Sequence, residues 1–203
     1  MYRRYFKRLL DINLSLTLIL LLFPLMFLIF ISVWIFIGFP IFSQKRPGLN
    51  NRIFTLYKFK TLYDSTKNNS EKYRKNRLGT FLRKWGLDEL PQLFNIFINN
   101  MSFVGPRPLL IKYLKIKEFK NHERRKCLPG ITGLAQVNNF TKLKKKRRKS
   151  KWRDQFILDK KYYNNITFKL DMLIFVLTIK KIIVSKKVDY FREAKLSSKH
   201  FYL

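Results

Sequence analysis

Cysteine, histidine and acidic residues are scarce in this 203-residue sequence. Cys127 is the only cysteine, and His122 and His200 are the only histidines. A single cysteine excludes an intramolecular disulfide framework and a thiolate metal cluster, and two histidines are too few for a histidine-rich metal centre. If a divalent cation binds, oxygen ligands are expected, and oxygen ligands favour Mg²⁺.

The shortage of acids leaves a large positive charge. Asp and Glu number 12 against 43 Lys and Arg, so the formal net charge is +31. This excess favours polyanionic partners, namely nucleic acid, anionic lipid headgroups or phosphorylated substrates; a general compositional bias toward Lys is the alternative. Residues 142–151 hold eight of these cations. That stretch is typical of a solvated loop, and beside a membrane it could also bind anionic lipid.

No charged residue lies between Ile12 and Gln44, a run of 33 positions. An apolar run beyond about 20 residues is long enough to span a bilayer as a helix. A cleaved signal peptide would have a shorter apolar region followed by small residues, whereas bulky residues continue here through Phe42. Basic residues flank both ends of the run, and the positive-inside tendency favours a cytoplasmic location for both flanks.

A helix that enters the membrane, bends and leaves on the same side satisfies both flanks. Pro24 removes one backbone donor and clashes with the carbonyl of Leu20, so we expect it to kink the helix. The sequence therefore predicts a re-entrant helix-break-helix over about residues 12–37. The alternative is a tilted single span that tolerates the proline.

The rest of the chain predicts helices with little strand. A β-rich stretch covers residues 53–57, and prolines and a glycine punctuate an irregular region over about residues 101–137. An amphipathic helix begins near residue 87, because large apolar residues recur after it at helical spacing. Further helices are expected over residues 77–85, 151–164 and 168–185. We therefore expect a mainly α fold with short β elements (α+β).

Asp88 and Glu89 form an acidic pair at the start of the helix near residue 87. Such a pair is usually a favourable N-terminal charge, but this chain has few acids and many cations close in sequence. Nearby cations and a helix N-terminus lower carboxyl pKa values, so we expect Asp88 to be ionised at neutral pH. An ionised carboxylate can attack phosphorus, and a neighbouring carboxylate can help to hold Mg²⁺. Arg107, fixed between two prolines, offers a planar fork to phosphate oxygens.

Five segments in order carry a family resemblance. They read Phe-Ser-Gln-Lys-Arg-Pro-Gly (42–48), Lys-Phe-Lys-Thr (58–61), Leu-Asp-Glu-Leu-Pro-Gln-Leu (87–93), Ser-Phe-Val-Gly-Pro-Arg-Pro (102–108) and Pro-Gly-Ile-Thr-Gly-Leu-Ala-Gln-Val (129–137). With these motifs, and over about residues 3–175, the chain resembles the bacterial sugar transferase family, the small monotopic polyprenyl-phosphate phosphoglycosyl transferases.

The resemblance implies a re-entrant membrane helix (residues 1–40, with its basic flank), a cytoplasmic catalytic domain with interfacial helices (41–185) and a polar tail (186–203). It also implies that Asp88 attacks the β-phosphate of a UDP-sugar, that UMP leaves, and that polyprenyl phosphate then takes the phosphosugar to begin a glycoconjugate. Glu89 would join Asp88 in binding Mg²⁺.

Further site residues follow from the same resemblance. Lys58, Lys60, Arg83 and Arg107 would face the phosphates. A family pattern reappears as Asp159, Tyr162 and Asn165, for which Tyr162 has either a substrate contact or a packing role. The implied location is the cytoplasmic face of the bacterial inner membrane, with anionic lipids as partners and a homo-oligomer left open.

The chain departs from the family pattern at several positions. Phe23 and Gly86 stand where serines are usual, Asn100 replaces an acid, and Leu128 and Phe140 replace arginines. These changes could alter sugar preference or weaken catalysis, so an assembly partner with little activity is the runner-up function. A nucleic-acid-binding protein would account for the charge and the aromatic residues, but not for the uncharged run or the ordered motifs.

Overall fold

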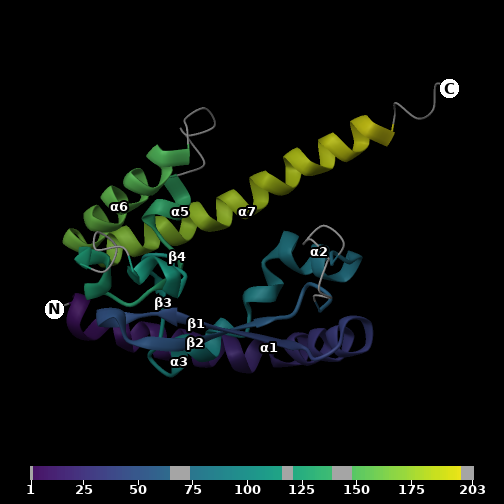
Figure 1. Cartoon of the computed structure of the whole chain (residues 1–203), viewed down its shortest axis with the longest axis horizontal. Coiled ribbons are helices and arrows are strands. Elements are labelled where there is room, and N and C mark those ends of the chain that lie inside the picture. The colour runs from purple at the N-terminus through teal and green to yellow at the C-terminus, as the bar shows by residue number, and fades with distance from the viewer. Residues whose placement is uncertain (1, 65–73, 116–120, 139–147, 198–203) are drawn as a thin grey trace.

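The computed structural model describes residues 2–64, 74–115, 121–138 and 148–197. One turn of π-helix, η1 (Tyr2–Phe6), leads into the long helix α1 (Lys7–Ile37). Figure 1 shows α1 along one side of the molecule, with the remaining elements stacked on it and α7 extending away toward the C-terminus. Two small sheets lie among the helices, so the expected mainly α fold with short β elements agrees with the structure.

Helix α1 runs from Lys7 to Ile37 with Pro24 inside it, so the chain stays helical where the sequence predicted a break, and the re-entrant bend stays a prediction. The residues on both sides of Pro24 pack on the same body of the protein: Ile19 packs in one apolar cluster, and Met26 and Ile29 pack in another. This packing stabilises the helical conformation across the position where proline removes one hydrogen bond. Within the described ranges, α1 is the one helix long and apolar enough to cross a membrane.

A hairpin follows α1. Strand β1 (Ile41–Pro47) pairs antiparallel with β2 (Ile53–Phe59), and the short helix η2 (Leu49–Asn51) forms the turn. The sequence predicted β2, which extends two residues beyond the expected end, but it did not predict β1. Asn95 fastens the hairpin to the helix that carries it, because its side-chain amide accepts from the Tyr57 N–H at 3.0 Å and donates to the Thr55 carbonyl at 2.8 Å.

Helix α2 (Arg77–Trp85) has the predicted bounds. The side chain of Asn76 caps it by accepting from the Gly79 N–H at 2.6 Å. Gly79 itself lies against the chain after β2, where an added Cβ would come within 2.0 Å of the Thr61 carbonyl oxygen. Only glycine permits this approach, and the approach brings α2 beside the end of the hairpin.

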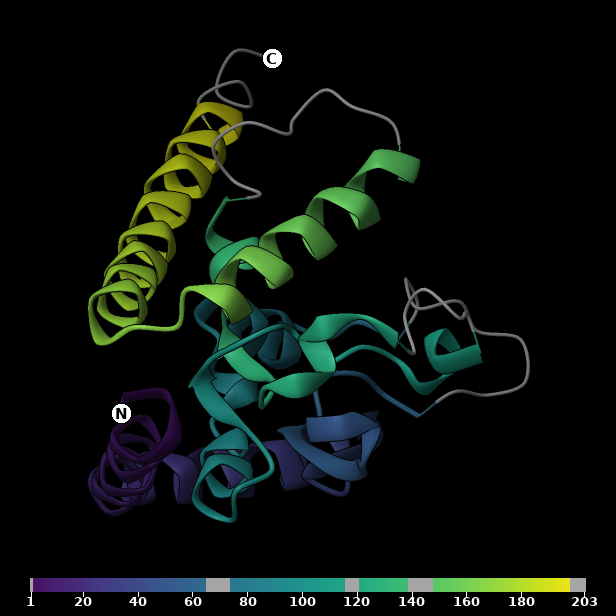
Figure 2. The same cartoon turned by 90° about the vertical axis from the view of Figure 1, so that its left-hand side faces the viewer.

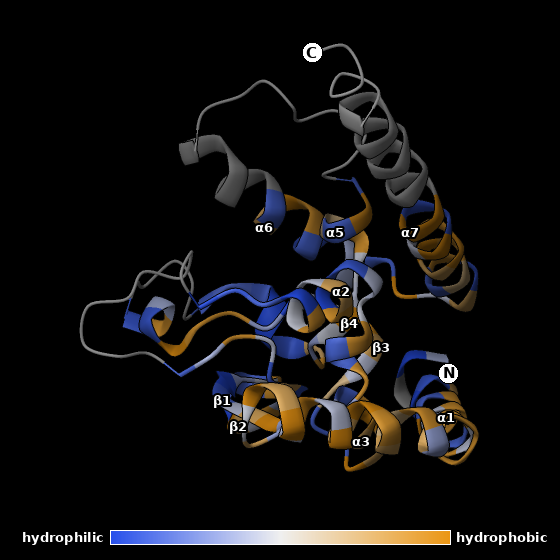
Figure 3. Ribbon diagram, turned by 90° about the vertical axis from the view of Figure 1, so that its right-hand side faces the viewer, coloured by the Kyte–Doolittle hydropathy of each residue, from blue (hydrophilic) through white to orange (hydrophobic). Residues whose placement is uncertain are grey.

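The predicted amphipathic helix near residue 87 is divided into a 3₁₀ turn, η3 (Leu87–Glu89), and the helix α3 (Gln92–Phe97). Helix α3 packs on α1, and Figure 3 shows the two apolar helices close together at one end of the molecule.

Within the described ranges, the region expected to be irregular includes five short elements. Strand β3 (Ser102–Val104) pairs parallel with β4 (Gly130–Thr132), and the other three are η4 (Ile111–Lys115), η5 (Glu123–Lys126) and α5 (Leu134–Asn138). Gly105 and Gly130 let the two strand ends touch, because a Cβ on Gly130 would lie 2.1 Å from the Gly105 nitrogen.

Two helices end the described chain, α6 (Arg148–Asn164) and α7 (Phe168–Ser197). Helix α7 continues past the predicted end at residue 185, so the expected polar tail begins inside a helix. Its first turn lies beside the N-terminus, as Figure 2 shows, where Tyr2 contacts Phe168 and Lys7 pairs with the buried Asp171 at 2.6 Å. Residues 142–147 of the basic stretch, and Phe140, lie outside the described residues.

Candidate active site

The acidic pair lies in the connection between helices α2 and α3. Helix α2 ends at Gly86, whose φ of +69° places it in the left-handed region, and η3 then carries Asp88 and Glu89. A left-handed cap favours glycine, and an added Cβ would meet nothing within 4 Å. The replacement of the family serine by Gly86 therefore suits the local backbone.

Asp88 lies half-buried among charges of both signs. The structure contradicts the expectation that its pKa is depressed: burial, and then the negative charge of Glu89, raise the pKa of the Asp88 carboxyl above its ordinary value. The positive charges of Lys58 and Arg83 act in the opposite direction but do not outweigh burial. The cations expected from the sequence are present. The sequence does not show how far the Asp88 carboxyl is buried, and burial is the largest effect on its pKa.

Lys58 and Arg83 are held close to the pair. The Lys58 ammonium lies 2.5 Å from Glu89 Oε1, and the Arg83 Nε donates to the Thr61 hydroxyl at 2.7 Å. Lys58 comes from β2 and Arg83 from the last turn of α2, so the close packing at Gly79 brings these two elements to one site.

A small polar pocket of about 30 Å³ opens beside Glu89. Arg46, Lys58 and Arg107 contribute cations to it, and Gln92 contributes an amide. Burial and the nearby charge of Arg107 lower the pKa of Arg46, so two guanidinium groups lie close together. A concentration of positive charge beside two carboxylates is suited to phosphate oxygens.

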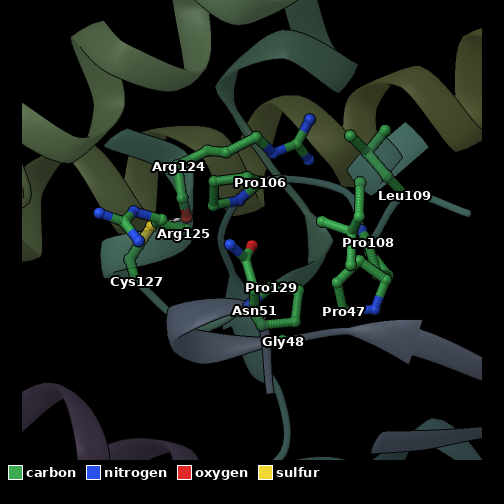
Figure 4. Close-up of a pocket in the computed structure, with 11 residues that line it drawn as sticks. Pro47, Gly48, Asn51, Pro106, Pro108, Leu109, Arg124, Arg125, Cys127 and Pro129 are labelled. Carbon is green, nitrogen blue, oxygen red and sulfur yellow. Dashed lines mark hydrogen bonds between the residues drawn. The ribbon is translucent and has the colours of Figure 1, made fainter. Parts of the chain in front are cut away.

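The side chain of Arg124 holds the backbone of Arg107 in place. The Arg124 guanidinium, which is buried, donates to the Arg107 carbonyl and lies 3.3 Å from the buried carboxylate of Asp159 without the alignment of a hydrogen bond. Figure 4 shows Arg124 beside Pro106 and Pro108, in a second pocket. Its opposite wall comes from Pro47 and Gly48 at the end of β1.

Two of the candidate site residues, Tyr162 and Lys60, do not line the polar pocket beside Glu89. Tyr162 is 1% exposed, and its hydroxyl lies 2.9 Å from the Val104 carbonyl oxygen and 2.8 Å from Asp171 Oδ1, so the structure supports the packing role and not substrate contact. The Lys60 ammonium pairs with the exposed Asp64 at 2.8 Å. Arg46 was missed by sequence reasoning, although its motif was recognised, because only the folded hairpin shows which of its cations faces the pocket.

The described residues contain no cluster of three or more His, Cys, Asp and Glu side chains. The acidic pair is therefore the candidate for a divalent cation. Mg²⁺ commonly binds through one or two carboxylates and completes its coordination with water and substrate phosphates, and the donor set of Asp88 and Glu89 fits that habit.

A carboxylate pair faced by cations can bind anionic groups, and the same chain carries a helix long and apolar enough to cross a membrane. The model of the bacterial sugar transferase family matches residues 2–185. The chain belongs to the bacterial sugar transferase family, which confirms the prediction of a sugar-transferring enzyme.

Named relatives support this assignment. The chain is 38% identical to the uncharacterized sugar transferase EpsL of Bacillus subtilis, over 90% of each chain. It is 37% identical to the UDP-glucose:undecaprenyl-phosphate glucose-1-phosphate transferase of Xanthomonas campestris, over 89% of this chain but 39% of that protein. It is also 33% identical to the exopolysaccharide production protein PSS of Rhizobium leguminosarum, over 85% of this chain and 92% of that protein.

Proposed function

We propose that the protein transfers a phosphosugar from a UDP-sugar to polyprenyl phosphate, with undecaprenyl phosphate as the acceptor, and releases UMP. The observation that carries this proposal is the placement of Glu89 in a pocket walled by Arg46, Lys58 and Arg107, with Asp88 next to it under the charges of Lys58 and Arg83. The relatives named as undecaprenyl-phosphate transferases support the substrate class. The product would begin assembly of a glycoconjugate.

The reaction has two steps. An Asp88 carboxylate oxygen attacks the β-phosphorus of the donor, the bond from that phosphorus to the oxygen bridging the two phosphates breaks, and UMP leaves with the electron pair. A phosphate oxygen of the acceptor then attacks the same phosphorus and displaces the Asp88 carboxylate. A covalent intermediate divides one difficult transfer into two easier ones. Lys58, Arg83 and Arg107 stabilise the phosphate charge.

Mg²⁺ is the proposed cofactor. Asp88 and Glu89 would hold it, and when bound it would neutralise charge on the donor diphosphate. The mutual repulsion of the two carboxylates, which raises the pKa of Asp88, would be relieved by such a cation. Removal of Mg²⁺ with a chelator is expected to stop turnover, and added Mg²⁺ to restore it.

The proposed location is the cytoplasmic face of the bacterial inner membrane, with α1 as a re-entrant element. Both halves of α1 contact the catalytic body: Arg8 donates to the carbonyls of Ile96 and Phe97, and Val33 and Ile37 pack with Phe59 and Leu82. A helix that touches the body along its whole length cannot also pass to the far side of a bilayer. This contact supports a monotopic arrangement.

Full-length protein in lipid nanodiscs, incubated with a panel of UDP-sugars, Mg²⁺ and undecaprenyl phosphate, tests the reaction. We expect UMP release with at least one donor, and Asp88→Asn to lower its rate by on the order of a thousandfold or more, as removal of a covalent nucleophile does. Mass spectrometry of the donor-only reaction should find a phosphosugar on Asp88. Equal silence of the wild type and Asp88→Asn across the panel would favour an assembly partner with little activity.

A further inference from the structure

Strand β2 has a polar face and an apolar face. Leu56 and Lys58 line the polar pocket, whereas Tyr57 and Phe59 line a wide apolar groove on the other side. Successive side chains of a strand point to opposite faces, so this division follows directly from the sequence of β2. Thr61 lies two residues beyond Phe59 and is buried against α2, the helix with which Phe59 shares an apolar cluster.

The backbone of Thr61 is held at the start of α2. Its carbonyl accepts a hydrogen bond from the Asn76 side-chain amide at 3.2 Å, and the same Asn76 side chain caps α2 through the Gly79 N–H. Gly79 also packs directly on the Thr61 carbonyl. Because threonine is branched at Cβ, a fixed backbone leaves its side chain few rotamers. The fold therefore determines the position of the Thr61 hydroxyl.

The Thr61 hydroxyl contacts the other end of α2. It accepts from the Arg83 Nε at 2.7 Å, and Arg83 lies in the last turn of that helix, before the Gly86 cap that leads into η3. A guanidinium group is planar, so a hydrogen bond at Nε fixes the direction in which the rest of the group points. An unconstrained arginine side chain samples many rotamers, and this contact selects among them.

We infer that Thr61 is a positioning residue, whose hydroxyl orients the Arg83 guanidinium toward the phosphate groups that react with Asp88. The inference rests on the proposed function, in which Arg83 stabilises phosphate charge. Arg83 lies close enough for its positive charge to act on the Asp88 carboxyl. Thr61 is 8% exposed and does not line the polar pocket, so we expect its effect on the reaction to pass through Arg83. A charge that is already oriented costs no reorganisation in the transition state.

Two substitutions of Thr61 test the inference. Thr61→Val replaces the hydroxyl with a methyl group of similar size, and Thr61→Ser keeps the hydroxyl. Protein in nanodiscs, given Mg²⁺ and the most active UDP-sugar of the donor panel without acceptor, should release a burst of UMP. We expect Thr61→Val to slow the burst about tenfold, as loss of a hydrogen bond to a charged group does. Thr61→Ser should stay within about threefold of the wild type, because it lacks only the methyl that restricts the rotamer.

The amplitude of the burst separates positioning from a merely structural role. The amplitude counts competent protein, and the rate reports the attack on phosphorus. Thr61→Val should keep the wild-type amplitude, and in steady state its kcat should fall while the KM for the UDP-sugar is unchanged. A lower amplitude or a lower Tm with an unchanged burst rate would contradict the inference.

Thr80→Val is the matched control. Thr80 is exposed on α2, and its hydroxyl donates to the Asn76 carbonyl at 2.7 Å. The substitution therefore removes a hydroxyl contact from the same helix by the same chemical change. Its burst rate should equal that of the wild type. A loss equal to that of Thr61→Val would show that any weakening of α2 slows the reaction, and would overturn the assignment.

A double-mutant cycle shows whether Thr61 acts through Arg83. Arg83→Gln should slow the burst by itself, and adding Thr61→Val should slow it by less than about a further twofold, because the contact is already lost. A full additional loss in the double variant would mean that Thr61 acts by another route. Absence of a burst in the wild type with every donor would refute the proposed function instead.

NMR tests the contact without turnover. In protein labelled with isotope-enriched arginine, the Nε–H signal that is missing from Arg83→Lys identifies Arg83. Exchange of this proton with water should be slow in the wild type and in Thr61→Ser, and about tenfold faster or more in Thr61→Val. Equal exchange in the wild type and Thr61→Val would contradict the inference, whatever the outcome of the donor panel.

Discussion

Two opposing influences act on the protonation of the Asp88 carboxyl group. Burial and Glu89 favour its protonated form, while Lys58 and Arg83 favour the ionised form that attacks phosphorus. Because burial prevails, the nucleophile is protonated at a higher pH than an exposed aspartate would be. The acidic limb of the activity profile should report this balance.

Lys58→Gln should move that limb. The substitution removes a positive charge that lowers the pKa of Asp88, so the pKa rises further and kcat/KM begins to fall at a higher pH than in the wild type. The measurement is the pH dependence of kcat/KM for the UDP-sugar. Lys161→Gln, which removes an exposed charge on α6, is the matched control and should leave the limb in place. An acidic limb that stays at its wild-type pH in Lys58→Gln would contradict this electrostatic coupling.

Asp159 offers a second test at the residue scale. Burial raises its pKa to about 6, although Arg124 acts to lower it. Because the folded-state pKa exceeds the unfolded value, the folded protein binds more protons between these two values, and this carboxyl makes stability fall as pH rises toward about 6. In Asp159→Asn this part of the pH dependence of Tm should disappear.

The same substitution tests the support of the Arg107 backbone. Asp159→Asn leaves the Arg124 guanidinium buried without its counter-charge, which should cost about 3 kcal/mol of unfolding free energy. The measurement is thermal unfolding in detergent. Lys160→Gln is the control, because it breaks an exposed pair with Glu123 and should cost well under about 1 kcal/mol. Equal losses in the two variants would show that burial of the Arg124–Asp159 pair is unimportant.

At the scale of elements, local signals predicted some parts of the fold and long-range contacts decided others. Helix α2 was predicted in full, because its apolar spacing and its boundaries are local properties. Strand β1 was missed, because it is defined by its pairing with β2. The continuity of α1 through Pro24 depends on packing on both sides of the proline, which no local pattern reveals.

The site divides in the same manner. Asp88, Glu89 and Arg107 were found because their motifs are contiguous in sequence, and the structure places Glu89 and Arg107 around one pocket. Arg46 and Tyr57 were not assigned roles, because their contributions depend on which face of the hairpin each side chain takes. For Tyr162 the sequence left substrate contact and packing open, because a motif does not show whether a hydroxyl meets solvent or a buried carboxylate such as Asp171.

At the scale of the whole molecule, the contact of α1 with the body along its length predicts its topology. Single cysteines at Tyr5 and Ser43, both exposed and on opposite ends of α1, should react with a membrane-impermeant maleimide only from the cytoplasmic side. The native Cys127 should react little with the maleimide, because burial raises the pKa of its thiol to about 12. Leu20→Cys, on the exposed apolar part of the helix, should stay unreactive. Labelling of Tyr5→Cys and Ser43→Cys from opposite sides would establish a spanning helix instead.

The alternation of side chains along β2 also determines where residues can be inserted into this hairpin. An extra residue in the turn at η2 would alter only the loop, but one inserted between Tyr57 and Lys58 would exchange the faces of every side chain on one side of it. The Lys58 ammonium, which pairs with Glu89, would then point to the apolar face of the hairpin, and the ring of Tyr57 would take its place beside the carboxylates. Drift in chain length should therefore be tolerated at the tip of this hairpin and forbidden in its second strand.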